Sequence, residues 1–181
     1  MSSILITTSR RTTDRVRAFI KDIHSVIPGS HRFNRGSMSL LELVSRIRQL
    51  EATCAFVLSS SRGNPRTLQI VSPSGDILYE LNIESGLLRR EIDPTGRFHV
   101  NRLVAVATMH NSDESVQMFS KAFANLLGIE FRTMSSQDDV AGGGSSDAIM
   151  VFWNIGDKVM WSTFHAQEGK EIGPRIRMTG V

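Results

Sequence analysis

The sequence predicts an α/β fold made of two similar lobes, and two observations carry this prediction. Short β-branched apolar runs alternate with segments whose apolar residues recur at the 3.6-residue period of a helix, which is typical of helices packed on a sheet. The pattern also repeats at an offset of 100 residues, which aligns Thr8 with Thr108 and Phe19 with Phe119. Two helices of one type match at some positions by chance, so internal duplication is a hypothesis at this point.

The first half is expected to run strand, helix, a short extended segment, helix and three strands. Residues 4–8 are short and β-branched, as in a buried strand, and the next apolar stripe, from Val16 to Ile27, follows a helical period. Ser39 and Glu42 form a capping box at the start of the second helix. The strands that follow are expected at 55–58, 68–71 and 77–83, with a loop at 59–65 and a turn at 73–75.

The second half is expected to begin again with a strand and a helix. The boundary is placed near Pro94, because the periodic pattern weakens between 84 and 101. We therefore expect one lobe at about 1–94 and the other at about 95–181. The expected elements are a strand at 103–108, a helix with its apolar face from Val116 to Leu127, a strand at 130–133, a loop from Ser135 to Asp147, and strands at 148–155, 158–165 and 172–178.

Composition and charge narrow the class of protein. The chain has 181 residues, of which 40% are hydrophobic and 22% charged, which is typical of a folded protein and excludes a disordered or collagen-like one. No apolar run approaches the roughly 20 residues that span a bilayer. A signal peptide is not expected, because the first apolar stretch is only Ile4-Leu5-Ile6, and the single cysteine, Cys54, suits a reducing compartment. We therefore expect a soluble cytoplasmic protein.

The positive charge is concentrated at one end of the chain. The formal net charge is only +3, but residues 1–66 hold 11 basic side chains against 4 acidic ones. The basic residues of the whole chain are 17 Arg and 4 Lys. Planar guanidinium groups suit bidentate contacts with phosphate and stacking on bases. The location of the charge therefore favours a nucleic-acid partner.

Two arginine clusters are candidate phosphate sites. In the first, Thr8, Ser9, Arg10 and Arg11 join the first strand to a helix, where free backbone N–H groups and the helix dipole attract anions. The alternative is that Thr12 or Thr13 only caps the helix and that the arginines are solvated.

The second cluster follows another strand. Arg62, Asn64 and Arg66 flank a glycine turn, and Arg35 adds charge between the two clusters. If the first strand and the strand at 55–58 run parallel, the clusters meet at one edge of the sheet. Incidental arginines on a turn are the alternative, but the two clusters together favour an anion groove.

Enzyme signatures are weak. Gly142-Gly143-Gly144 lacks the lysine of a phosphate-binding loop and is expected to be a mobile loop. The histidines show no metal-ligand spacing, and Asp138 and Asp139 are expected to be solvated, although a weak Mg²⁺ contact stays open. No catalytic residue, metal site or cofactor is predicted.

Several motifs carry a family resemblance. In order they are Ile4-Leu5-Ile6-Thr7-Thr8-Ser9-Arg10-Arg11, Phe19 with Lys21-Asp22, Ile27-Pro28, Arg35-Gly36, Leu41-Glu42-Leu43, Gly63-Asn64-Pro65 and Glu171-Ile172-Gly173-Pro174-Arg175. Over nearly the whole chain the sequence resembles the Brix-domain ribosome-biogenesis proteins, and it is most like their compact archaeal single-domain form. One departure is Phe152-Trp153, where many relatives have an aromatic residue followed by Arg.

The resemblance implies a fold and a function. It implies that 1–181 is a single Brix domain of two lobes, each similar to the anticodon-binding domain of class II aminoacyl-tRNA synthetases. It also implies a non-enzymatic factor that binds ribosomal RNA or pre-rRNA in a basic groove and assists rRNA processing and subunit assembly, with other ribosome-assembly proteins as further partners. The candidate RNA-binding residues are Thr8, Ser9, Arg10, Arg11, Arg15, Arg35, Arg62, Asn64, Arg66 and Arg175.

Two other functions stay open from the sequence. One is a protein-interaction scaffold in a pre-ribosomal complex, with Phe152, Trp153 and Trp161 docking a partner. The other is a nucleotide-binding enzyme that uses the turn from Thr8 to Arg11.

Overall fold

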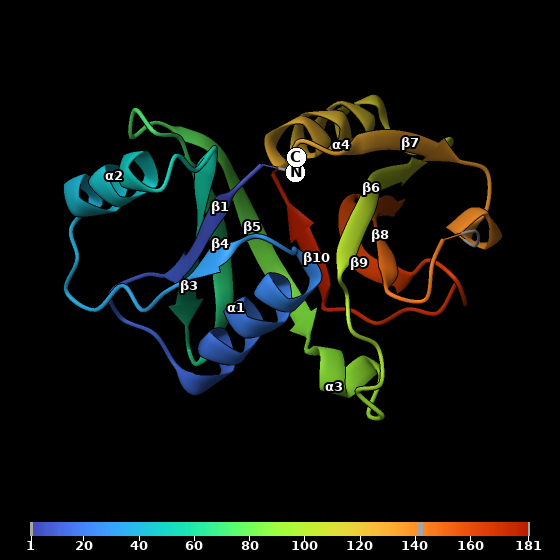
Figure 1. Cartoon of the computed structure of the whole chain (residues 1–181), viewed down its shortest axis with the longest axis horizontal. Coiled ribbons are helices and arrows are strands. Elements are labelled where there is room, and N and C mark those ends of the chain that lie inside the picture. Colours follow the sequence, from blue (N-terminus) through green and yellow to red (C-terminus); the bar gives the residue numbers. More distant parts are fainter. Residues whose placement is uncertain (1, 141–142, 181) are drawn as a thin grey trace.

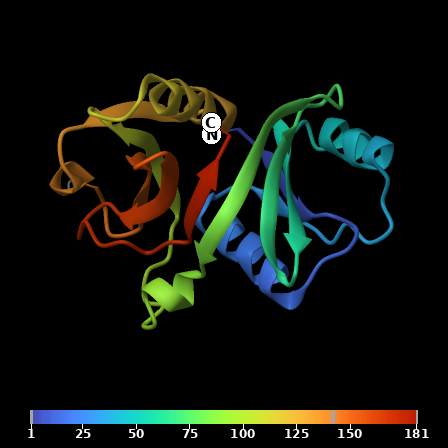
Figure 2. The same cartoon turned by 180° about the vertical axis from the view of Figure 1, so that it is seen from behind.

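A single curled, mixed sheet of ten strands forms the centre of the molecule (Figures 1 and 2). The computed structural model describes residues 2–140 and 143–180. Across the sheet the strands follow the order β2-β1-β3-β4-β5-β10-β9-β8-β6-β7. The predicted α/β class is confirmed.

The elements of the first half follow the predicted order. They are β1 (Ile4–Thr8), α1 (Asp14–Val26), β2 (His31–Arg32), α2 (Leu40–Gln49), β3 (Cys54–Ser61), β4 (Asn64–Val71) and β5 (Ile77–Leu87). A short helix, α3 (Arg89–Ile92), leads into the second half. Ser39 caps α2 and exchanges hydrogen bonds with Glu42, which confirms the capping box.

The second half repeats much of this order. Its elements are β6 (Arg102–Met109), α4 (Glu114–Leu127), β7 (Glu130–Met134), the 3₁₀ helix η1 (Gln137–Val140), β8 (Asp147–Ile155), β9 (Lys158–His165) and β10 (Arg175–Thr179).

Strand directions match between the two halves. β1 pairs in parallel with β2 and β3, whereas β3, β4 and β5 pair antiparallel. In the same way β6 pairs in parallel with β7 and β8, and β8, β9 and β10 pair antiparallel. The halves meet where β5 and β10 pair antiparallel. Counted inward from either edge of the sheet, the strands therefore follow the same order and relative directions.

One core joins both halves. The buried faces of α1 and α4 contribute to the same apolar cluster, together with residues from both ends of the sheet. At the junction the rings of Phe56 and Phe123 lie 5.5 Å apart, and the ring of Phe119 meets that of Tyr79 edge-on at 5.1 Å. The aromatic contacts therefore cross from one half to the other.

Smaller clusters cover the other face of the sheet. In the first half, Leu43 and Ile47 of α2 pack on Leu5 and Val57. In the second half, Val140 at the end of η1 belongs to a cluster with strand residues such as Ile149 and Phe164.

Several expectations were wrong in detail. The segment 59–65 is not a loop, because β3 and β4 extend to a tight turn at Arg62-Gly63. The expected strand at 172–178 begins only at Arg175, and the expected loop from Ser135 to Asp147 contains η1. Ala141 and Gly142 of that loop lie outside the described residues, as does the side chain of Asp138.

Burial also overturns one proposed docking surface. Phe152 and Trp161 are each 0% exposed, because both rings stack in the common core. Neither can dock a partner. Beside the apolar stripe of α1, Arg15 and Asp22 are half-buried because α3 packs beside them, whereas Lys21 is exposed.

Candidate nucleic-acid interface

The predicted arginine clusters come together at one edge of the sheet. β1 and β3 run parallel with Thr8 opposite Leu58, so both strands end at the same edge, where β4 begins. Thr8 is buried at the end of β1, whereas Arg10 and Arg11 are exposed beyond it. We call the side chains of Arg10, Arg11, Arg35, Arg62 and Arg66 the arginine edge.

Hydrogen bonds tie the two clusters together. The Ser9 N–H donates to the Leu58 carbonyl oxygen (2.9 Å), and the Ser60 hydroxyl donates to the Arg11 carbonyl oxygen (3.1 Å). The Thr13 hydroxyl donates to the Gly63 carbonyl oxygen (2.9 Å). The strand-to-helix turn and the β3–β4 turn therefore form one connected surface.

Thr13 also begins helix α1. Its side chain accepts a hydrogen bond from the Val16 N–H, so the predicted cap is confirmed at this residue. The capping alternative and the phosphate-site hypothesis are compatible, since Arg10 and Arg11 lie outside the helix and stay exposed.

The β3–β4 turn presents its arginine to solvent. Arg62 has φ +48° and Gly63 has φ +87°, the left-handed pair that a two-residue hairpin turn requires. Beside the turn lies a shallow cavity of about 420 Å³, lined by Arg62, Asn64, Arg66 and Glu84 among others. The loop between β2 and α2 brings a further cation, Arg35.

Arg35 lies close enough to Arg10 for their charges to interact. Its Nε donates to the Met38 carbonyl oxygen (3.0 Å), which holds the side chain in place. Partial burial lowers the pKa of Arg35, and the nearby positive charge of Arg10 lowers this pKa further. Like charges held together in this way favour binding of an anion.

Two candidate residues are engaged elsewhere. Arg15 forms a bidentate ion pair with Glu91 (2.9 and 3.1 Å) and donates to the Gly86 carbonyl oxygen. Arg175 pairs with Glu171, with 2.7 Å between Arg175 Nε and Oε1. Each side chain therefore has fewer free N–H donors for a phosphate than an unpaired arginine.

The described residues contain neither a candidate metal cluster nor a membrane-spanning helix. Among residues 2–140 and 143–180, no group of three or more His, Cys, Asp or Glu side chains is placed to hold a metal ion. No described helix has the length and apolar character needed to cross a membrane. Cys54 is buried at the start of β3, as expected, and burial raises the pKa of its thiol to about 12.

Comparisons with known proteins point in one direction. No family model matches the sequence. The chain is 39% identical over 70 residues to a probable Brix domain-containing ribosomal biogenesis protein of Aeropyrum pernix, a match that covers 39% of each chain. It is 31% identical over 182 residues to the U3 small nucleolar ribonucleoprotein protein IMP4 of Yarrowia lipolytica, covering 97% of this chain and 60% of the relative. These matches thus span less than two thirds of either relative's length.

A solved structure extends the likeness to the fold. The crystal structure of a probable ribosomal biogenesis protein from Aeropyrum pernix superposes with a TM-score of 0.78 at 25% identity. The superposition covers 100% of this chain and 97% of that one. In sequence the chain is therefore similar to Brix-domain ribosomal biogenesis proteins and to IMP4, and in fold to a probable ribosomal biogenesis protein, which confirms the resemblance drawn from its motifs.

Proposed function

We propose that this protein is a ribosome-biogenesis factor that binds ribosomal RNA or pre-rRNA along the arginine edge and assists rRNA processing and subunit assembly. The names of its relatives support a role in ribosome biogenesis. The proposal assigns it no catalytic residue, and its partners are RNA and other ribosome-assembly proteins.

One observation carries the RNA proposal. Among the described residues, no carboxylate lies within ion-pair distance of Arg10, Arg11, Arg62 or Arg66, whereas nine ion pairs form elsewhere. Guanidinium groups gathered at one edge without counter-charges are the arrangement that binds phosphates. Hydrogen-bonding groups next to this edge come from Thr8, Ser9 and Asn64. Additional phosphate contacts would come from Arg15 and Arg175, which lie beside it.

The proposal includes the domain organisation. The chain is a single domain whose lobes, about 1–94 and 95–181, arose by internal duplication, each similar to the anticodon-binding domain of class II aminoacyl-tRNA synthetases. The matching strand orders and directions of the two halves support this proposal. Helices α1 and α4 begin 100 residues apart, at the offset that the sequence suggested.

Phosphate contacts position RNA without reading its sequence. Specificity therefore comes from RNA shape or from exposed bases. A double variant, Arg10→Ala with Arg62→Ala, tests the contacts through the salt dependence of binding to small-subunit ribosomal RNA. Each lost phosphate contact lowers the slope of log K against log salt by about 0.7–0.9, so a loss of about 1.4–1.8 is expected.

Arg46→Ala together with Arg48→Ala is the matched control, because both residues lie on α2, away from the arginine edge, and the charge change is the same. If the double variant at positions 10 and 62 binds with the affinity and slope of this control, the arginine edge does not hold the RNA.

A further inference from the structure

The second half contains a cavity that the arginine edge does not use. It measures about 500 Å³ and lies between β6, β7 and the start of β8. Pockets for small ligands typically enclose roughly 300–1,000 Å³. The cavity is therefore large enough for a small ligand.

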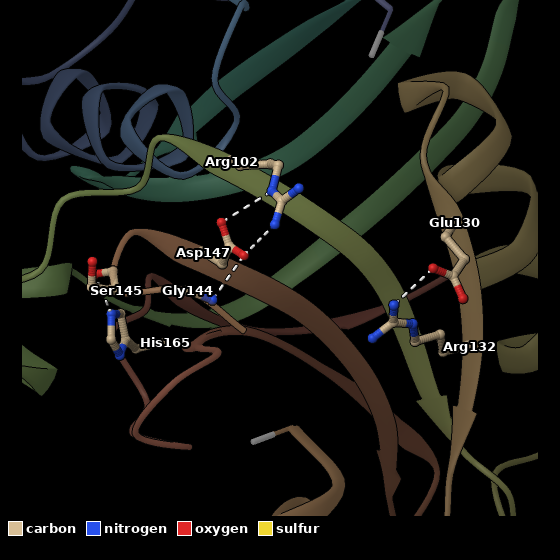
Figure 3. Close-up of polar contacts among 7 residues, drawn as sticks. All are labelled: Arg102, Glu130, Arg132, Gly144, Ser145, Asp147 and His165. Carbon is tan, nitrogen blue, oxygen red and sulfur yellow. Dashed lines mark hydrogen bonds and ion pairs between the residues drawn. The ribbon is translucent and has the colours of Figure 1, made fainter. Parts of the chain in front are cut away.

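Two ion pairs border this cavity (Figure 3). Arg102 holds Asp147 through two contacts, Nε to Oδ1 (3.0 Å) and Nη2 to Oδ2 (2.5 Å), and the Gly144 N–H also donates to Oδ2 (2.9 Å). On β7, Arg132 pairs with Glu130 at 2.8 Å, and Figure 3 shows its side chain reaching toward β6.

The ion pairs leave hydrogen-bonding groups free for a ligand. The Asp147 side chain is only 9% exposed, whereas that of Arg102 is 70% exposed, so the carboxylate fixes a guanidinium that still faces solvent. The Arg132 and Glu130 side chains are 44% and 58% exposed. Each guanidinium has five N–H donors and uses only some of them in its pair.

The inner wall of the cavity is apolar. Val104 and Ile129 line it as half-buried residues, whereas Leu103 and Ile149, also in its lining, are each only 2% exposed. An apolar wall beneath convergent polar groups is the usual composition of a ligand pocket.

The balance of charge indicates which ligand fits. Two guanidinium groups face two carboxylates, so the rim is neutral overall and a bare anion gains little there. A nucleotide offers phosphate oxygens to the arginines, hydroxyl and amino groups to the carboxylates, and a flat ring to the apolar wall. Proteins recognise single-stranded RNA largely through such unstacked bases, sometimes stacked on guanidinium planes.

The cavity lies at the same edge of the sheet as the arginine edge. Five successive antiparallel pairings separate β3 from β8, so β8 begins at the edge where β3 ends. β6 runs parallel to β8 and begins there too. A single RNA strand bound to the arginine edge can therefore continue along this side of the sheet to Arg102, where β6 begins.

We propose that this cavity takes one unpaired nucleotide of the bound RNA, with the base against Val104 and Ile129 and the phosphate at Arg102 and Arg132. The inference rests on the proposed RNA-binding function and adds a site in the second lobe that reads an exposed base.

Two variants test the site in the full chain with a short unstructured RNA. Val104→Phe fills the cavity and lowers RNA affinity about fivefold, the effect of losing roughly 40 Å² of apolar contact with the base. Arg132→Ala lowers the salt slope by about 0.7, the value for one phosphate contact on a single strand. Arg46→Ala is the control with the same charge change. Arg132 lies at the surface, so this variant keeps the test valid if Val104→Phe fails to fold.

A second arm separates a nucleotide from a simple anion. Adenosine monophosphate is expected to shift the amide resonances of Ile129 and Gly144, and Val104→Phe removes the shift, whereas inorganic phosphate leaves both signals in place. If inorganic phosphate shifts them equally, or if Arg132→Ala binds RNA as Arg46→Ala does, the nucleotide site is refuted. In one outcome, the double variant Arg10→Ala with Arg62→Ala loses RNA binding while Arg132→Ala binds RNA normally. That result would refute this inference but leave the proposed function standing.

Discussion

Gly86 of β5 shows how closely single residues are packed. A Cβ atom at this position would lie 2.5 Å from Cζ of Phe19, whose ring is 1% exposed. The ring is held in the core and cannot move aside, so Gly86→Ala is expected to lower the free energy of unfolding by about 1–3 kcal/mol, the usual effect of overpacking.

Urea unfolding followed by circular dichroism measures this effect. Ser85→Ala is the neighbouring control, because Ser85 is exposed and the change adds no atom to the core. An unfolding midpoint of Gly86→Ala equal to that of the control would show that the Phe19 ring has room to shift.

The Asp147 carboxylate gives the fold a pH dependence. The hydrogen bonds from Arg102 and from the Gly144 N–H lower the pKa of Asp147 below its usual value of 3.8. A lowered folded-state pKa means that the ionised form is favoured by folding. This stabilisation is complete above the unfolded-state pKa and is lost as the pH falls through the folded-state value.

The variant Asp147→Asn is therefore expected to be less stable than the natural protein at neutral pH. The difference should shrink as the pH falls below about 4. Unfolding curves at a series of pH values measure it, and a difference that stays constant down to pH 2 would mean that the Asp147 charge contributes nothing.

At the residue scale, the sequence predicts the cap at Thr13 and the exposure of Arg10, because both depend on neighbours in the chain. It does not predict that Arg15 pairs with Glu91, or that Arg102 pairs with Asp147, since 76 and 45 positions separate these partners. Contacts of this kind appear only once the sheet is assembled.

At the element scale, Thr13 couples helix α1 to the β3–β4 turn. Its hydroxyl accepts from the Val16 N–H and donates to the Gly63 carbonyl oxygen. Thr13→Ala is expected to lower stability by about 1 kcal/mol, the typical cost of losing a helix cap. It should also raise amide hydrogen exchange around Arg62.

Thr13→Ser keeps the hydroxyl and is the matched variant for this experiment. Thermal unfolding and hydrogen exchange of both variants measure the coupling. Equal exchange rates at Arg62 in the Ala and Ser variants would show that the turn is held without Thr13.

Most elements are visible in the sequence because each has its own periodic apolar pattern. Helix α3 was missed, since its four residues bury no side chain and leave no such pattern. The turn at Arg62-Gly63 was read as a longer loop, because Asn64 and Pro65 are typical of turns, although here they begin β4. Tertiary pairing with β3 overrides that local preference.

At the scale of the whole molecule, Arg89 joins three distant segments at the junction of the halves. Its guanidinium donates to the Ser25 hydroxyl (2.8 Å), the Phe98 carbonyl oxygen (2.8 Å) and the Ile172 carbonyl oxygen (3.2 Å). The backbone N–H of Arg89 also donates to the Asp22 carboxylate (2.8 Å). Helix α1, the linker and the approach to β10 are therefore held by one residue.

Removing this side chain leaves partly buried acceptors without donors. Arg89→Ala is expected to lower the free energy of unfolding by about 2–4 kcal/mol, as several hydrogen bonds from a charged donor are lost together. Arg90→Ala is the matched control, because Arg90 is adjacent and exposed. Both halves share one core, so chemical denaturation should still proceed in a single transition when tryptophan fluorescence, to which the buried Trp161 contributes, and far-ultraviolet circular dichroism are compared. If Arg89→Ala matches Arg90→Ala in stability, Arg89 does not hold the junction. Separate transitions for the two probes would instead show that the common core does not couple the halves.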